Sequence, residues 1–243
     1  LVLLTTDTVH HRYFCERLSR DGIAFDVCFL EREHLRPPFD IGPFYEEEEF
    51  AFERERFGVD PGGEFDGNNV VQVRTMNTEE ARREVARIRP DLGVVFGTGK
   101  LSGALIDLFP DGLLNVHRGI AQEYRGLDSD YWAIYHGDYD NLGVTIHKVE
   151  PALDTGPIAA QRKLRLTNDM RIYHLRYFGT VLAAEMMRTV LKGYIDGAME
   201  VWPQGKRGRY YSFMPLVLRN LIATKFHKHC SKLEKPVGDE RVL

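Results

Sequence analysis

The stretch LGVVFGTGKLSGALIDLFPDGLLNVH, residues 92–117, decides the fold class of this chain. It opens with the apolar run 92–96 and closes with a second apolar run at 113–116, and a helical pattern at 102–108 connects them. Short apolar runs that alternate with helices are typical of parallel β-strands buried on both faces of a sheet. We therefore expect two parallel strands joined by a short helix.

The same alternation extends in both directions along the chain. The residue patterns predict further strands at 1–5, 25–30, 70–73, 142–149 and 158–166, the last two antiparallel, and further helices at 10–20, 78–88, 131–136 and 171–194. The tail from Val201 onward is basic, aromatic and irregular. We expect an α/β core at 1–166, built on a mostly parallel sheet, and a small C-terminal appendage at 167–243 that holds the long helix and the basic tail.

The composition excludes several classes of protein. Of the 243 residues, 43% are hydrophobic and 28% are charged, which excludes wholesale disorder. The net charge of -4 argues against a nucleic-acid partner. No apolar run reaches the ~18–20 residues that span a bilayer, and the N-terminal residues 1–4 indicate a buried strand, not a signal peptide. Three cysteines without CxxC spacing favour a reducing compartment, so we expect a cytoplasmic protein.

Charge is unevenly distributed along the chain. Residues 31–66 contain 12 acidic and 4 basic side chains, a net charge of -8, whereas residues 198–243 contain 9 basic and 4 acidic side chains, a net charge of +5. We expect the acidic segment to face away from the site, and the alternation of Glu and Arg at 53–56 to form an exposed helix face. The basic tail is the better candidate to hold an anionic ligand. Residues 213–233 can form an amphipathic helix that we expect to pack on the domain or on a second subunit, not on a membrane.

Two motifs give only weak signals of a ligand site. Gly97-Thr98-Gly99 follows a predicted strand, but Gly103 comes one residue too late for a dinucleotide fingerprint, and Val94 and Leu101 occupy positions where a P-loop needs Gly and Ser or Thr. The run 227–230, His-Lys-His-Cys, has no second cluster of metal ligands, so we expect no metal site.

His10 and His11 lie just beyond the first predicted strand, where a ligand-binding loop is expected in a parallel sheet. A histidine pair at the start of a helix is the commoner explanation. The sequence leaves both interpretations open.

Polar side chains at the end of the strand 113–116 are candidate catalytic groups. Asn115 and His117 flank Val116, and strand alternation points both toward the same side, at the edge where ligands bind. An Asn donates hydrogen bonds without changing charge and a His moves protons near neutral pH, so the pair suits stabilisation of an oxyanion. Asp154 lies in a tight turn between two predicted strands, where its carboxylate can fix the tautomer of a neighbouring His and hold it ready as an acid.

Four motifs that occur in this order resemble the folate-dependent formyltransferase family. They are Leu113-Leu-Asn-Val-His117, Glu123-Tyr-Arg-Gly126, Gly143-Val-Thr-Ile-His147 and Leu153-Asp-Thr-Gly-Pro-Ile158. The resemblance is close over residues 70–165 and looser over the N-terminal strands. It implies a Rossmann-like fold, 10-formyltetrahydrofolate as co-substrate, no metal, and transfer of the formyl group to a primary amine.

The resemblance also implies roles for individual residues. The family's catalytic Asn, His and Asp fall on Asn115, His117 and Asp154. The pterin pocket is expected to be lined by the backbone of two loops, namely Phe96, Gly97, Thr98 and Gly99 after one strand, and Glu150, Pro151, Ala152 and Leu153 before the Asp.

The acceptor is expected to be unusual, because residues 118–123 replace the Ser-Leu-Leu-Pro that usually follows the family's His. Arg118, Tyr124, Arg125 and Asp128 are the candidate acceptor-binding residues, and the two arginines would pair with an anionic group. The resemblance is strongest to the sugar-nucleotide N-formyltransferases, which implies a small-molecule amine, a nucleotide-linked amino sugar, and a chain that can form a homodimer. The alternatives are glycinamide ribonucleotide, an amino-acid-derived amine, or water in a formyltetrahydrofolate hydrolase. Initiator methionyl-tRNA ranks lower, because the residues after 197 are few for a nucleic-acid-binding domain.

Overall fold

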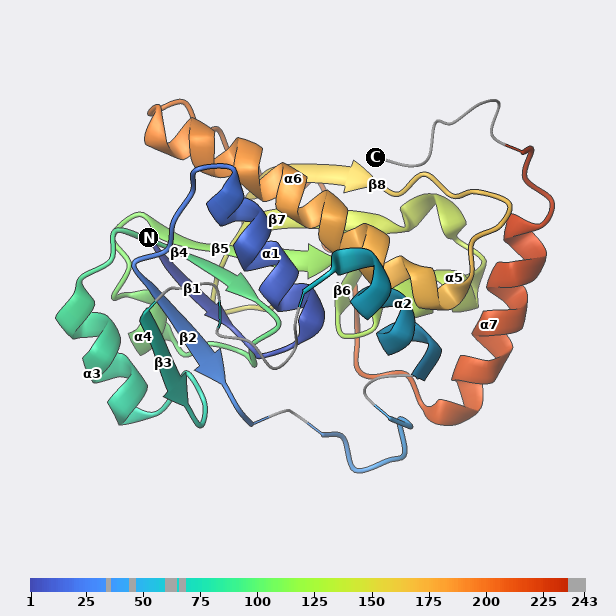
Figure 1. The fold of residues 1–243 in the computed structure, drawn as a ribbon, viewed down its shortest axis with the longest axis horizontal. Coiled ribbons are helices and arrows are strands. Elements are labelled where there is room, and N and C mark those ends of the chain that lie inside the picture. Colours follow the sequence, from blue (N-terminus) through green and yellow to red (C-terminus); the bar gives the residue numbers. More distant parts are fainter. Residues whose placement is uncertain (34–35, 44–46, 60–64, 66–68, 236–243) are drawn as a thin grey trace.

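Strands and helices alternate through the residues that the computed structural model describes, which are 1–33, 36–43, 47–59, 65 and 69–235 (Figure 1). In chain order the elements are β1 (Val2–Thr5), α1 (Val9–Arg20), β2 (Val27–Glu31), α2 (Glu47–Phe57), β3 (Asn69–Val73), α3 (Glu79–Ile88), β4 (Leu92–Phe96), α4 (Gly103–Ile106), β5 (Gly112–Arg118), β6 (Tyr124–Gly126), α5 (Ser129–His136), η1 (Tyr139–Asn141), β7 (Gly143–Lys148), β8 (Ile158–Lys163), η2 (Ile172–His174), α6 (Leu175–Ile195), β9 (Arg209–Tyr211) and α7 (Leu216–Cys230). Parts of the acidic segment and the last residues of the basic tail lie outside the described residues.

The main sheet has the strand order β3-β2-β1-β4-β5-β7-β8. Its first five strands are parallel, and β7 and β8 are antiparallel to their neighbours. The predicted fold, a Rossmann-like, mostly parallel α/β sheet, is confirmed. Because β1, β4 and β5 are adjacent and parallel, their carboxyl ends meet at one edge of the sheet, where the crevice of such folds lies.

Helices cover both faces of the sheet. On one face α1 and α6 pack on a core that includes Leu3 and Leu114, and on the other α3 and α4 pack on Leu4 and Leu113. Neighbouring residues on a strand point to opposite faces, so the apolar pairs in β1 and β5 serve both cores. Each buried Leu contributes on the order of 1.5–3 kcal/mol. The long helix α6, assigned by the sequence to the appendage, thus packs directly on the sheet.

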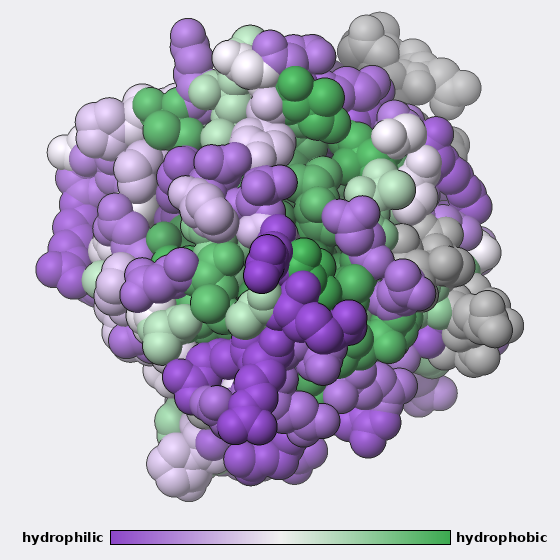
Figure 2. Space-filling view, turned by 90° about the vertical axis from the view of Figure 1, so that its left-hand side faces the viewer, coloured by the Kyte–Doolittle hydropathy of each residue, from purple (hydrophilic) through white to green (hydrophobic). Residues whose placement is uncertain are grey.

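The surface is mixed in character. Figure 2 views the end of the molecule that carries α3 and shows hydrophobic side chains gathered near the middle of that face among hydrophilic ones. The edge strand β3 is mostly exposed, since Val70 is 37% exposed and only Val73 of the strand is buried. No helix within the described ranges is long and apolar enough to cross a membrane.

The basic tail is more regular than its sequence indicates. β9 pairs in parallel with β6, a short strand that follows the candidate catalytic strand. The helix α7 packs against α5 and buries Ile222, Phe226 and Cys230, as expected for an amphipathic helix that packs on the domain. The prediction that the tail is irregular was therefore wrong for β9, because this strand depends on β6, a partner far away in the sequence.

The acidic helix α2 is tied to α6 by buried ion pairs. Arg176 donates to Glu53 through two nitrogens, at 2.6 and 3.0 Å, and its third nitrogen lies 3.0 Å from Glu49. Glu53 is only 1% exposed. The expectation that residues 53–56 form an exposed helix face was wrong for Glu53, because α6 supplies a charge partner 123 residues away.

We expect Arg176→Ala to destabilise the fold by roughly 3–5 kcal/mol, because it leaves two buried carboxylates without their counter-charge. The matched control is Arg162→Ala, which breaks an exposed pair with Glu185 and should cost less than about 1 kcal/mol. Urea unfolding of both variants measures the difference. If both variants lose the same small amount of unfolding free energy, the buried ion pairs between α2 and α6 do not stabilise the fold.

Candidate active site

The carboxyl end of β5 carries two of the predicted catalytic residues. Asn115 and His117 face the same side of the strand and line a cavity of about 390 Å³. Val116 between them also has its backbone at the cavity, but its side chain is buried in the core beneath. The alternation expected from the sequence therefore places the amide and the imidazole side by side.

Asp154 reaches the same cavity from the loop between β7 and β8. Its backbone is left-handed, with φ of 54°, a conformation that is uncommon outside glycine. Neighbouring groups hold this loop from two sides: Gln204 donates to the carbonyls of Asp154 and Gly156, both at 2.9 Å, and Arg125 donates to the carbonyl of Leu153 at 3.0 Å. The carboxylate is thereby fixed facing β5.

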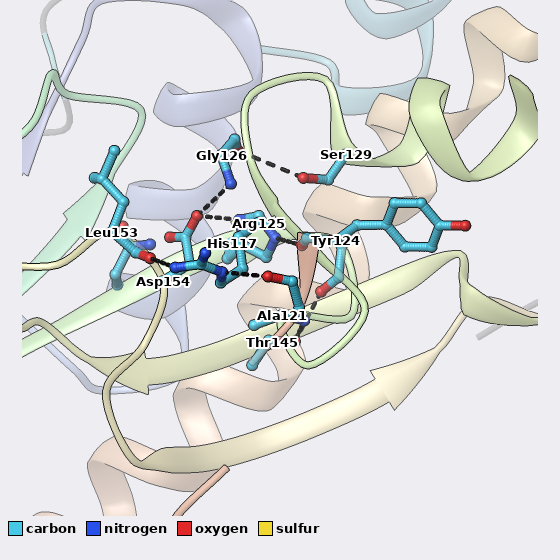
Figure 3. Close-up of polar contacts among 12 residues, drawn as sticks. His117, Ala121, Tyr124, Arg125, Gly126, Ser129, Thr145, Leu153 and Asp154 are labelled. Atoms are coloured by element: carbon cyan, nitrogen blue, oxygen red, sulfur yellow. Dashed lines mark hydrogen bonds and ion pairs between the residues drawn. The ribbon is translucent and has the colours of Figure 1, made fainter. Parts of the chain in front are cut away.

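Two histidines flank the Asp154 carboxylate, and Figure 3 shows one of them, His117, beside it. His117 Nδ1 lies 3.5 Å from Oδ2, and His147 Nε2 lies 3.3 Å from Oδ1. The backbone N–H of Gly126 donates to Oδ2 at 2.7 Å. Burial alone would raise the pKa of Asp154, but His117, His147 and the Gly126 N–H together hold it well below its ordinary value. Asp154 is therefore a carboxylate at neutral pH.

The other nitrogen of each imidazole is bound to a backbone carbonyl. His117 Nε2 donates to the carbonyl of Tyr124 at 2.8 Å, and His147 Nδ1 donates to that of Lys148, also at 2.8 Å. A carbonyl only accepts, so each ring has one proton committed to the backbone. The nitrogen that faces Asp154 can donate only when its ring carries a second proton. Asp154 is the acceptor placed to receive that hydrogen bond.

His147 is a functional candidate that ends the third sequence motif, and no role was predicted for it. It pairs with Asn115 across the β5–β7 ladder, and Asn115 Nδ2 lies 3.2 Å from His147 Nε2. Strand alternation applied to β7 as well as β5 would have pointed to it. Asn115 Nδ2 carries a second hydrogen that has no partner among the described residues and is available to a ligand in the cavity.

The predicted pterin loops lie on the cavity in part. Of their eight residues, Phe96, Gly97, Thr98, Gly99, Glu150 and Leu153 line the cavity, whereas Pro151 and Ala152 lie in an exposed turn outside it.

A buried carboxylate anchors the first of these loops. Glu31, at the end of β2, accepts from the backbone N–H of Gly99 at 2.8 Å and from that of Met76 at 2.7 Å. Gly97 has φ of 84°, and a Cβ there would come within 2.7 Å of His11 Nε2. The loop needs glycine at this point because an L side chain would meet both backbone strain and a clash.

The four predicted acceptor-binding residues are split. Arg118 and Asp128 line the cavity. Tyr124 and Arg125 do not: the Tyr124 ring points away from Asp154 (Figure 3) and its hydroxyl donates to Asp138, while Arg125 donates to the carbonyls of Gly208 and Leu153. Arg125 is buried and serves to position backbone.

A charged wall forms one side of the cavity. It comprises His10, Glu49, Arg118, Asp130, Tyr131 and Arg176, from five different elements. Both of its arginines face carboxylates: Arg118 lies 3.8 Å from Asp130, and Arg176 binds Glu49 and Glu53. The expectation that the acidic segment faces away from the site was wrong, since α2 contributes Glu49 to this wall. Among the described residues, no group of three or more His, Cys, Asp or Glu side chains is arranged to hold a metal.

Comparison with known proteins relates the chain to formyl transferases. The profile of the family described as Formyl transferase matches residues 45–180, more than half of the chain. A methionyl-tRNA formyltransferase from Myxococcus xanthus is 29% identical over 170 residues, which cover 70% of this chain and 54% of the relative. One from Roseiflexus castenholzii is 34% identical over 139 residues, which cover 57% and 44%. The chain spans about half the length of these curated relatives.

Solved structures share the fold. A 4-N formyltransferase from Francisella tularensis aligns with a TM-score of 0.60 at 15% identity, over 87% of this chain and 75% of that one. A formyltransferase from Anoxybacillus kamchatkensis, in complex with UDP-4,6-dideoxy-4-formamido-L-AltNAc and tetrahydrofolate, aligns with a TM-score of 0.53 at 16% identity, over 87% and 85%. A glycinamide ribonucleotide transformylase from Symbiobacterium toebii aligns with a TM-score of 0.59 at 17% identity, over 83% and 92%.

The buried carboxyl of Glu49 should make stability depend on pH. Burial raises the pKa of Glu49 to about 7, although the positive charges of Arg176 and Arg118 act to lower it. A carboxyl whose pKa is raised in the folded chain stabilises it fully below its unfolded pKa, about 4.3, and this contribution is lost as the pH rises through about 7. We expect wild type to lose on the order of 3 kcal/mol relative to Glu49→Gln between about pH 4 and 8, measured by urea unfolding.

The matched control is Glu48→Gln, which removes an exposed carboxylate from the same turn of α2. Its pH profile should run parallel to that of wild type. A parallel profile for Glu49→Gln as well would show that Glu49 does not carry the pH dependence.

Proposed function

The chain belongs to the formyl transferase family, and we propose that it transfers a formyl group from 10-formyltetrahydrofolate to the primary amine of a small molecule. The observation that carries this proposal is the meeting of Asn115, His117 and Asp154 at one cavity, between a glycine-containing loop and the turn before Asp154. An amide, an imidazole and a carboxylate in contact are the groups that an acyl transfer without a covalent enzyme intermediate requires.

The cavity fits a folate donor. One side offers backbone from residues 96–99 and the side chains of Glu150 and Leu153, a mixture of donors, acceptors and apolar surface that suits a planar pterin. Gly97 lets the backbone approach a flat ligand closely, since the loop carries no side chain there. Asn115, His117 and Asp154 line the same cavity, so we propose that the formyl group of a bound donor lies beside Asn115 and His117.

Asn115 and His117 supply stabilisation where negative charge develops. The free hydrogen on Asn115 Nδ2 donates to the formyl oxygen, and the imidazolium of His117 places positive charge next to it. Fixed donors act strongly there because they need no reorganisation, and losing one typically costs about 10²–10³ in rate. Asp154 keeps the imidazolium in place and relays a proton toward the departing nitrogen, directly or through water.

For the acceptor we propose a nucleotide-linked amino sugar that enters amine first. The arginines inside the cavity already face carboxylates, so an anionic group would be held nearer the mouth. Tyr210, 52% exposed, and Phe213 line that mouth. An aromatic rim suits a nucleobase or sugar ring, and Arg207 and Arg209 beside it are exposed. The complex of the Anoxybacillus kamchatkensis enzyme with a UDP-linked formamido sugar supports the same class.

Methionyl-tRNA is a second candidate acceptor. The two curated relatives reported above are methionyl-tRNA formyltransferases, and the family profile covers Asn115, His117 and Asp154. This candidate requires contacts to RNA that the charged wall does not offer, because it holds the carboxyl groups of Glu49 and Asp130, with Glu53 bound to its Arg176.

The function is tested with a panel of acceptors incubated with 10-formyltetrahydrofolate and followed by mass spectrometry. The panel contains amino-sugar nucleotides, glycinamide ribonucleotide, hydroxyornithine-type amines and initiator methionyl-tRNA. We expect one amino-sugar nucleotide to gain a single formyl group, and Asn115→Ala, His117→Ala and Asp154→Ala each to lower the rate by about 10²-fold or more.

Asn220→Ala and His227→Ala, exposed residues of the same types on α7, are the matched controls and should retain the wild-type rate. Formylation of the tRNA alone would replace the proposed acceptor. Formate release without any acceptor would indicate a hydrolase, and wild-type turnover in any of the three triad variants would refute the catalytic assignment.

The loop 96–99, proposed to contact the folate, gives a separate prediction. Gly97 and Gly22 have the same φ of 84°, but a Cβ would clash with His11 at Gly97 and meet nothing within 4 Å at Gly22. Both Ala variants should lose roughly 1 kcal/mol of stability to backbone strain. Only Gly97→Ala should weaken tetrahydrofolate binding, which calorimetry measures. Equal affinity in the two variants would remove this loop from the folate site.

A further inference from the structure

Thr145 of β7 is a polar residue that is 0% exposed and that the proposed mechanism does not use. It lies directly opposite His117 in the antiparallel β5–β7 ladder, and Gln161 lies opposite Thr145 in the β7–β8 ladder. Directly opposed residues of an antiparallel pair place their side chains on the same face of the sheet. His117, Thr145 and Gln161 therefore form one row across three strands.

The Thr145 hydroxyl uses all of its hydrogen-bonding capacity. Oγ1 donates to the carbonyl of Gly119 at 2.7 Å and accepts from the backbone N–H of Ala121 at 3.1 Å (Figure 3). It also accepts from Nε2 of Gln161 at 2.9 Å. A hydroxyl has one hydrogen and two lone pairs, so all three are engaged. The side chain thus holds two backbone groups of the segment 119–124.

The segment 119–124 touches His117 at two points. The backbone of Gly119 passes directly beside the ring, because a Cβ at this position would lie 2.8 Å from His117 Nε2. The carbonyl of Tyr124, at the other end of the segment, accepts from the same nitrogen at 2.8 Å. A turn joins the two points, in which the N–H of Tyr124 donates to the carbonyl of Ile120 at 2.9 Å. A shift of this segment would therefore move the groups that orient the ring.

Two glutamines extend the row to the C-terminal tail. Oε1 of Gln161 accepts from Nε2 of Gln122 at 3.4 Å, and Oε1 of Gln122 accepts from the backbone N–H of Gly205 at 2.6 Å. The amide of Gln161 is thereby oriented with its NH2 group toward Thr145. Because that NH2 group and an N–H of the segment occupy both lone pairs of the hydroxyl, its hydrogen is directed to the carbonyl of Gly119.

Loss of the hydroxyl would leave buried groups without this partner. Gly119 and Ala121 are both buried, so their carbonyl and N–H could not simply turn to water. A buried polar group that loses its hydrogen bond carries the full cost of its desolvation. The segment would have to move to find other partners, and the ring of His117 would move with it.

We propose that Thr145 is a positioning residue for the formyl transfer and acts through His117. Its hydroxyl holds the segment 119–124 in place, so that the carbonyl of Tyr124 binds Nε2 of the ring. Nδ1 is then left facing Asp154, as the proposed mechanism requires. The proposal rests on the proposed formyl transfer, since it assigns Thr145 a role in that reaction. Thr145 does not line the cavity, so it touches neither donor nor acceptor.

The test compares Thr145→Val, which keeps the shape of the side chain, with Thr145→Ser, which keeps the hydroxyl. We expect Thr145→Val to lower kcat with the amine identified in the acceptor panel by about 10–10²-fold, since a misplacement of ~1 Å can cost 10²-fold. Thr145→Ser should restore most of this rate. The KM for 10-formyltetrahydrofolate should stay at the wild-type value in both variants. Rates are compared at a temperature at which urea unfolding shows every variant to be folded.

The matched control is Thr180→Val. Thr180 is also 0% exposed, and its hydroxyl donates to the carbonyl of Arg176 in its own helix at 2.7 Å. Removal of this hydroxyl should leave kcat unchanged, because its hydrogen bond does not reach the segment 119–124. An equal loss of kcat in Thr180→Val or in Thr145→Ser would overturn the proposal. A rise in KM as large as the fall in kcat would also overturn it, because general damage to the site would then explain both.

Gln161→Leu tests the same row without changing Thr145. It removes one of the three bonds of the Thr145 hydroxyl from a half-buried position. We expect a smaller loss of kcat, about 2–10-fold, as for one lost hydrogen bond. This variant decides the outcome if Thr145→Val does not fold, and an unchanged kcat in Gln161→Leu would then overturn the proposal.

An NMR measurement separates this proposal from the proposed function. The Nε2–H of His117 is bound to a carbonyl and the residue is 5% exposed, so its proton should exchange slowly enough to give a signal in wild type and in Thr145→Ser. The signal should be shifted or lost in Thr145→Val. If wild type formylates no amine, the proposed function fails, whereas the signal still reports whether Thr145 positions the ring. An unchanged signal in folded Thr145→Val would overturn the proposal.

Discussion

The site depends on one constraint, a carboxylate held in a left-handed turn between two histidines. Asp154 can take this position only because the Gly126 N–H binds its side chain and Gln204 binds its backbone. The histidines in turn are oriented by the carbonyls of residues 124 and 148, so the other nitrogen of each ring faces Asp154. The Asp154 carboxylate is therefore contacted by groups from β5, β6, β7 and the tail. The strained backbone of Asp154 persists because these contacts together hold it in place.

A second consequence of the fold concerns charge. The acidic segment, residues 31–66, has a net charge of -8, which is typical of a solvated surface. In the structure two of its carboxylates are buried against Arg176, and one of them, Glu49, forms part of the cavity. Burial, together with the charges of His11 and Arg176, lowers the pKa of His10 in the same wall. A segment whose composition indicates an exposed surface thus contributes charge to the wall of the cavity that the triad lines.

Local pattern was enough to predict the parallel sheet, the two covering layers of helices, and the shared orientation of Asn115 and His117. These features follow from strand alternation and from short apolar runs, which are properties of neighbouring residues. The burial of Glu53, the structural role of Arg125, the pairing of His147 with Asn115, and the strand β9 could not be predicted in the same way. Each depends on a partner 28 or more residues away, and the two partners come together only when the chain has folded.

The bonds from Gln204 to the Asp154 loop also order events during biosynthesis. Gln204 follows Asp154 by 50 residues, and β9, which pairs with β6 beside Gly126, comes later still. Chains are made from the N-terminus, so a nascent chain that has already released all three triad residues from the ribosome still lacks the groups that hold the turn. The candidate site is therefore completed last, after the sheet that supports it, because its turn is held only once the basic tail has packed onto the core.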